Sequence, residues 1–197
     1  MRSNMKTWMW LALLAVIASA AHGQSTLRVR GTITEFDGSL LTVKSRDGKN
    51  LKLKLVDNAT VVAAKAMKLE DLKPGDYVGS TTRTGPNGER VAVEIHTLAA
   101  TTPAGHTSWD LEPESMMTNG NVASVQSASG QYVTLQYKDG AQKIVVPPGT
   151  PIVTNTPADR SYLKSGEYIF TTAQVAADGT MTVQRVQVSR EVVRPPQ

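Results

Sequence analysis

The sequence predicts an all-β protein with minor helix, in which one strand-rich module is written twice. The stretch Leu72–Val78 (LKPGDYV) returns as Leu163–Ile169 (LKSGEYI), and Gly31–Ile33 returns as Gly120–Val122. The matches keep the same order along the chain and fall mostly at turns and at apolar strand positions. Two copies are too few for a solenoid, which needs at least three repeats to bury a continuous core. The pattern therefore indicates an internal duplication.

The first module spans residues 24–98, and apolar alternation predicts five strands and one short helix in it. The alternation is clearest where Leu51, Leu53 and Leu55 alternate with lysines. The expected elements are strands at 27–36, 40–46, about 51–55, 76–84 and 90–98, with a helix at Lys65–Leu72.

The second module spans residues 118–190 and repeats this order. Thr156 is the expected helix N-cap, because Pro157 suits the first turn and Asp159 completes a capping-box-like pattern. The inward phase of the last strand slips near Gln184–Arg185, which predicts a β-bulge. Three strands, a short helix and two strands match a five-stranded OB-like β-barrel. We expect two such barrels in tandem, with a pair of small β-sandwiches as the alternative.

Residues 1–23 have the features of a secretory signal peptide. Arg2 and Lys6 precede the apolar run Trp8–Ala20, which is too short for a typical transmembrane helix. Cleavage is expected before Gln24, with Ala20/Ala21 as the alternative site and an uncleaved anchor as the alternative reading. The predicted location is periplasmic or secreted, with no transmembrane segment after cleavage. The chain has no Cys, so disulfides and thiolate metal sites are excluded.

The linker at 99–117 belongs to neither module, and a tail follows at 191–197. The linker contains Trp109, Met116 and Met117, and a purely flexible linker seldom contains such side chains. We therefore expect it to dock on a barrel.

Several segments of both modules and of the linker carry a resemblance to a known family. They are Val29–Ile33, Leu41–Lys44, Leu69–Val78, Trp109–Leu111, Met116–Asn119 and Lys143–Val153. Over nearly the whole mature chain, the protein resembles an uncharacterised family of exported bacterial proteins with tandem OB-like β-barrel domains. Its members often carry a label linking them to metal transport. The resemblance implies fold and compartment, and it carries over no catalytic or binding residues.

The first candidate site is a basic face on the outside of strands one to three. Alternation places six basic side chains there: Arg28, Arg30, Lys44, Arg46, Lys52 and Lys54. In OB-type barrels the face around strands two and three is a common ligand platform, so the expected partner is an anionic envelope component or protein. Nucleic acid is not expected, because the face offers no aromatic side chain for base stacking. A solvated strand face guarded by lysines is the alternative interpretation.

The linker offers a possible counterpart to this face. It carries Asp110, Glu112 and Glu114 and no basic residue, whereas residues 24–98 hold 12 basic and 9 acidic residues, a charge of +3. We hypothesise that the linker lies near the basic face and partly neutralises it.

The second candidate is a metal site in the linker. Its possible ligands are His106, Asp110, Glu112, Met116 and Met117. Imidazole with carboxylates suits Zn or Ni, and thioethers suit Cu(I), although the spacing matches no ligand motif. No cofactor is expected otherwise.

The sequence shows no nucleophile motif, zinc-protease motif or phosphate loop, so we do not expect an enzyme. The predicted function is an exported, non-enzymatic binding or accessory module of the cell envelope. A metal-homeostasis accessory protein and a structural envelope protein are the alternatives.

Overall fold

The computed structural model describes residues 25–190 and 193–194. The predicted signal peptide and most of the predicted tail lie outside the described residues. Twelve strands confirm the all-β prediction. They are β1 (Ser25–Phe36), β2 (Leu40–Ser45), β3 (Asn50–Ala66), β4 (Tyr77–Thr84), β5 (Arg90–Thr97), β6 (Gly105–Ser108), β7 (Met116–Gln126), β8 (Tyr132–Tyr137), β9 (Gly140–Val145), β10 (Ile152–Ala158), β11 (Tyr168–Val175) and β12 (Met181–Val188).

A closed five-stranded barrel, the first barrel, is built from β1, β2, β3, β11 and β12. Neighbouring strands are antiparallel, except that β3 and β12 close the ring in parallel. Its core holds apolar side chains from both ends of the chain, such as Ile33, Leu53 and Val186. Buried and exposed side chains alternate along these strands, because one face of each strand packs on this core.

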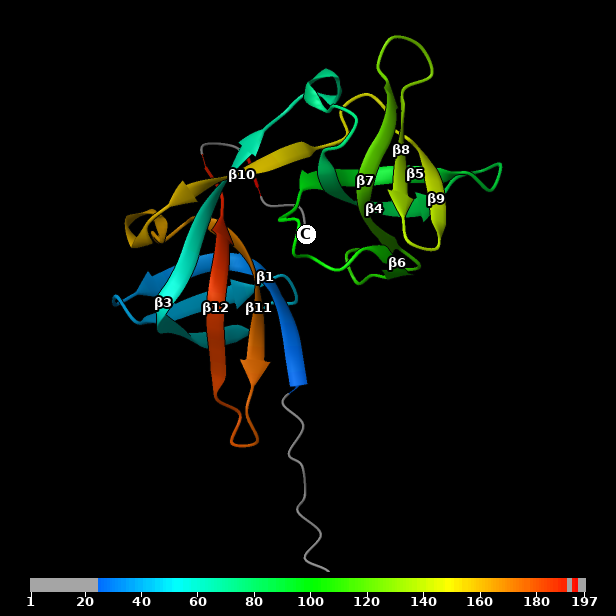
Figure 1. Ribbon diagram of the computed structural model, residues 1–197. Helices are drawn as coiled ribbons and strands as arrows, with labels where there is room; N and C mark the ends of the chain where they lie inside the picture. Colours follow the sequence, from blue (N-terminus) through cyan, green and yellow to red (C-terminus); the bar gives the residue numbers. More distant parts are fainter. Residues whose placement is uncertain (1–24, 191–192, 195–197) are drawn as a thin grey trace, which may run out of the picture.

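A second ring of strands joins β5, β4, β7, β8 and β9. A short parallel pairing of β5 with β9 closes the ring. The strand β6 pairs with the first residues of β7, on the edge of β7 opposite β4. Val78, Ile95 and Leu135 are fully buried inside this ring. Figure 1 shows the two bodies side by side, with β6 below β7 and β4.

The prediction of two tandem barrels, at 24–98 and 118–190, is not confirmed. The first barrel takes three strands from the first repeat and two from the second, and the second ring does the reverse. Equivalent strands of the two repeats carry the same alternation, so each can complete the other repeat's barrel. The chain therefore passes between the bodies along β3 and β10, which pair antiparallel from Val61↔Ala158 to Ala66↔Val153 (Figure 1).

This crossing corrects the predicted helix at Lys65–Leu72. β3 continues to Ala66, and only the 3₁₀ turn η1 (Leu69–Asp71) follows. Pairing with β10 satisfies the backbone groups of 61–66, and it outweighs the helix propensity of the local sequence.

The second predicted helix is also wrong, because Thr156 lies within β10. Asp159 is the cap instead, and its carboxylate accepts a hydrogen bond from the Ser161 backbone N–H (2.7 Å) at the 3₁₀ turn η2 (Arg160–Tyr162). The predicted bulge is confirmed: the register of β12 against β3 shifts between Val183 and Arg185.

Two equivalent glycines allow close approach between strands. A Cβ on Gly31 would lie 2.3 Å from the carbonyl oxygen of Lys44, and one on Gly120 would lie 2.4 Å from that of Gln136. Both repeats therefore require glycine at the same place in the barrel.

None of the helices in the described part of the chain has the length and apolar character needed to span a bilayer.

Candidate functional site

The outer face of β2 and β3 presents a row of lysines. Leu41 pairs with Leu53 on the core face, whereas Thr42 pairs with Lys52, Leu40 with Lys54 and Lys44 with Asn50. Because side chains alternate along each strand, Lys44, Lys52 and Lys54 point away from the core, and all three are exposed. We call these three residues the lysine row.

The lysine row places three positive charges on one exposed face. Within the described residues, no ion pair links Lys44, Lys52 or Lys54 to a carboxylate. Glu35 is the acidic residue of β1. It pairs with Thr42 of β2, which in turn pairs with Lys52 of β3, so a strand separates Glu35 from Lys52. Removing a lysine ammonium group from water costs free energy, and an anionic partner can offset that cost. The lysine row is therefore suited to such a partner.

The predicted basic face divides into two parts, because in the described part of the chain its three arginines contact the linker and its three lysines do not. Arg30 donates two hydrogen bonds to the Asp110 carboxylate, at 2.9 and 3.2 Å. Arg28 lies 3.7 Å from the same carboxylate, and its guanidinium stacks 3.9 Å from the centre of the Trp109 ring. Arg46 donates to the backbone carbonyl of Leu111 at 2.8 Å. These contacts confirm that the linker docks on the basic face.

Arg30 requires a correction. Its side chain points out of the barrel, as predicted, but only 5% of it is exposed. Asp110 covers it, and the Phe170 ring lies 5.0 Å from its guanidinium. A ligand can therefore reach Arg30 only if the linker moves.

The docked part of the linker is the tip of the β6–β7 hairpin, residues 109–115, which we call the acidic loop. Ser108 pairs with Met116 at its base. The backbone N–H of Trp109 donates to the Ser115 carbonyl at 2.8 Å, and the buried Ser115 hydroxyl donates to the carbonyl of Glu112 at 2.8 Å. These bonds close the loop on itself, so it reaches the first barrel as a preformed unit.

The electrostatics at the tip favour a negative charge. Partial burial raises the pKa of Asp110, but the hydrogen bonds and charge of Arg30, with the charge of Arg28, outweigh it and hold that pKa below its ordinary value. The Asp110 carboxylate is therefore an anion held by two arginines.

The acidic loop also contains two unfavourable features. The indole Nε1 of Trp109 is buried without a hydrogen-bond partner, and an orphaned buried donor costs about 1–3 kcal/mol. Glu114 has φ of 57°, the one positive value at a non-glycine residue among those described. Such a backbone costs about 1–3 kcal/mol, so the conformation of the loop is held against opposing contributions.

The structure does not gather the candidate metal ligands around one point. The His106 Nδ1 lies 2.7 Å from the Thr118 hydroxyl, and its ring stacks on Tyr137. Burial, and then the charge of Arg90, lower the pKa of His106. Asp110 binds Arg30 on the other body, and Met117 is buried in β7.

Two metal candidates remain, Glu112 and Met116. Glu112 is exposed on the loop, and Met116 is half-buried at its base. In the described residues, no group of three or more His, Asp or Glu side chains is arranged to hold a metal ion.

Sequence reasoning missed a buried polar cluster on β4 and β5. Glu94 and His96 are 1% and 2% exposed. One Glu94 carboxyl oxygen accepts bonds from the Thr81 N–H (2.9 Å) and hydroxyl (2.5 Å), and the other lies 2.7 Å from the His96 Nδ1. In β5, Glu94 and His96 alternate with apolar residues, a pattern that predicts polar side chains facing solvent. The local sequence therefore gives no signal that both side chains are buried.

Comparison with protein-family models, curated proteins and solved structures finds no match. The resemblance given by the sequence therefore stays a prediction.

Proposed function

We propose that the protein is an exported, non-enzymatic binding or accessory module of the cell envelope, which holds an anionic partner on the outer face of β2 and β3. The observation that carries this proposal is the lysine row: Lys44, Lys52 and Lys54 are exposed and have no carboxylate within ion-pair distance among the described residues. Export rests on the signal-like sequence of residues 1–23.

The strand arrangement of the first barrel supports an OB-like assignment. Its ring order, with β3 and β12 parallel and β1 and β11 antiparallel, agrees with a five-stranded OB-type barrel whose fourth and fifth strands are β11 and β12. In such barrels the face of strands two and three is a common ligand platform. The lysine row lies on the equivalent strands.

The neighbours of the row favour a polyanion or charged surface over single-stranded nucleic acid. Beside the lysines, the strand registers place Thr32, Glu35, Leu40, Thr42 and Asn50 on this face. None is aromatic, and single-strand binders use aromatic side chains as stacking platforms. Charge therefore has to supply most of the affinity.

The test is co-sedimentation with vesicles of phosphatidylcholine alone or with phosphatidylglycerol. Wild-type protein should bind only the anionic vesicles, and raising the salt should weaken binding because exposed charges are screened beyond about 8 Å at physiological ionic strength. Each lysine near an anionic surface contributes about 1 kcal/mol. Lys52→Glu with Lys54→Glu should therefore weaken binding about thirty-fold or more.

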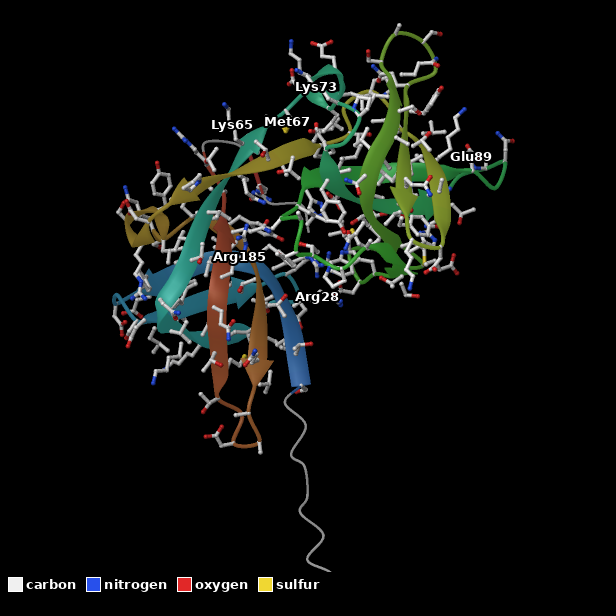
Figure 2. All side chains as sticks on the ribbon, in the orientation of Figure 1. Arg28, Lys65, Met67, Lys73, Glu89 and Arg185 are labelled. Atoms are coloured by element: carbon white, nitrogen blue, oxygen red, sulfur yellow. The ribbon has the colours of Figure 1, made fainter. Side chains whose placement is uncertain are left out.

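The matched control is Lys73→Glu with Lys164→Glu, which makes the same charge change at exposed lysines outside the row. Figure 2 shows Lys73 beside η1, away from Arg28 and the basic face. Equal loss in both double variants would contradict the proposed site, because it would indicate that net charge alone governs binding.

A further inference from the structure

The position of the Asp110 carboxylate points to a second binding element beside the lysine row. We propose that Arg28, Arg30 and Arg46 form a site for a carboxylate or phosphate group, that Asp110 occupies this site in the docked state, and that an anionic ligand binds there by displacing the acidic loop. The inference deepens the proposed function, on which it rests, by naming the ligand group and the segment that controls access.

The arginine cluster has the geometry of an anion site. Arg30 grips Asp110 through two nitrogens, at 2.9 and 3.2 Å, and this fork is the arrangement in which guanidinium recognises carboxylates and phosphates. Arg28 adds a second positive charge at 3.7 Å. An incoming anion would therefore meet the same donors that Asp110 now uses.

There is room for a small anionic group next to this position. A hollow of about 270 Å³ lies against Arg28, Arg46 and Asp110, and the ion pair of Lys49 with Asp47 (2.8 Å) lines it as well. Ordinary ligand pockets begin at about 300 Å³, so the hollow suits a headgroup or a single acidic side chain. Figure 2 shows Arg28 on the side of β1 that faces the second body.

The site is continuous with the lysine row. Arg46 keeps the β2 ladder going, because its N–H donates to the Arg30 carbonyl at 2.7 Å. On β1, Thr32 pairs with Lys44, and Arg30 lies on the same face as Thr32 because alternate residues of a strand face the same side. A ligand bound along the lysine row therefore reaches the arginines without leaving the face.

The acidic loop is built to leave as a unit. Its own hydrogen bonds from Trp109 and Glu112 to Ser115 do not depend on the first barrel. Docking does not satisfy the Trp109 Nε1, which stays without a hydrogen-bond partner while Arg28 stacks on the ring. The Asp110 side chain is 48% exposed, so a competing anion can approach it from solvent.

The test uses the full chain with Trp8→Phe and Trp10→Phe, so that Trp109 is the only indole. Sodium phosphate should change the Trp109 emission saturably, whereas sodium chloride at equal ionic strength should not. Asp110→Asn should bind phosphate at least about five-fold more tightly, the lower end of typical coupling between sites. Glu112→Gln, which removes the same charge from an exposed position of the loop, should bind like the parent.

The proposal is overturned if phosphate and chloride act alike on the parent chain, or if Asp110→Asn binds no tighter than Glu112→Gln. The parent titration needs no loop variant, so a misfolded Asp110→Asn would leave the proposal falsifiable. Anionic vesicles in place of phosphate test whether a lipid headgroup occupies the same site.

The double variant Lys52→Glu with Lys54→Glu separates the two proposals. Vesicle binding that depends on these lysines, with phosphate binding to Asp110→Asn no tighter than to Glu112→Gln, would overturn this inference and support the proposed function. Phosphate binding that tightens in Asp110→Asn, without any vesicle binding, would support this inference and overturn the proposed function.

Discussion

Replacement of Glu94 by alanine should destabilise the protein by about 3–5 kcal/mol, the range for removing one member of a buried polar pair. The Glu94 carboxyl group is almost fully buried and contacts three polar groups: the Thr81 N–H, the Thr81 hydroxyl and the His96 Nδ1. Alanine would leave all three without their partner.

The magnitude follows from those contacts. Each buried polar group that loses its partner costs about 1–3 kcal/mol. Water that enters the vacated space would form hydrogen bonds with some of these three groups. The total loss of unfolding free energy should therefore stay well below the sum of the three separate costs. Glu94→Gln is the matched control, because its amide oxygen can still accept both bonds from Thr81. It should cost only about 1–2 kcal/mol, through the changed contact with His96.

Urea unfolding followed by circular dichroism measures both variants. For a chain of this size, the alanine variant should also lower Tm by about 6–20 °C, at roughly 2–4 °C per kcal/mol. A loss below 1 kcal/mol for Glu94→Ala, or equal losses for the two variants, would refute the argument that hydrogen bonding by this carboxyl group stabilises the fold.

Three further outcomes are expected. Gly31→Ala and Gly120→Ala should each lower the unfolding free energy by about 1–3 kcal/mol, because each Cβ meets a carbonyl oxygen of the adjacent strand; a neutral result at either would contradict the close approach. Burial, with the charge of Arg90, lowers the pKa of His106 from 6.5 in the folded state. The unfolded state therefore binds the proton more readily, and the free energy of unfolding should fall as the pH drops through 6.5. The variant His106→Asn should flatten this fall in a plot of urea midpoint against pH, and an unchanged slope of that plot would exclude His106 as its source. The pKa of Asp110 is lowered from 3.8, so the docking that its charge stabilises should persist at neutral pH and be lost only below about pH 4; a Trp109 emission change near neutral pH would contradict this.

The strands could be predicted from sequence because their alternation is local. Leu41, Val43 and Leu53 are fully buried, as the pattern indicates. The partners of the strands could not be predicted in the same way. β4 and β11 follow equivalent anchors and present equivalent faces, so the sequence does not distinguish a barrel closed within one repeat from one closed across both.

The crossing strands show why local propensity misled. Ala63 and Ala64 precede a run of good helix formers, and the sequence therefore favours a helix nearby. In the fold both alanines are buried where β3 pairs with β10, a contact that joins residues some ninety positions apart. Tertiary pairing of this kind leaves no local signal.

The candidate site was predictable in part for the same reason. Alternation placed Arg30 and Lys52 on the outside of the barrel, and the charge of the linker indicated where it docks. The sequence could not show that Asp110 covers Arg30 or that Glu94 is buried, because both depend on how distant segments pack against each other.

NMR mapping of backbone amide shifts in isotope-labelled protein, during titration with phosphatidylglycerol nanodiscs, locates the binding surface residue by residue. If an anionic partner binds the basic face, the largest shifts should fall on β2 and β3 around Lys44 and Lys52 and extend to Arg46. Shifts confined to β8 and β9, beside the exposed Lys138 and Lys143 of the second ring, would contradict the proposed site and move the binding surface to the other body.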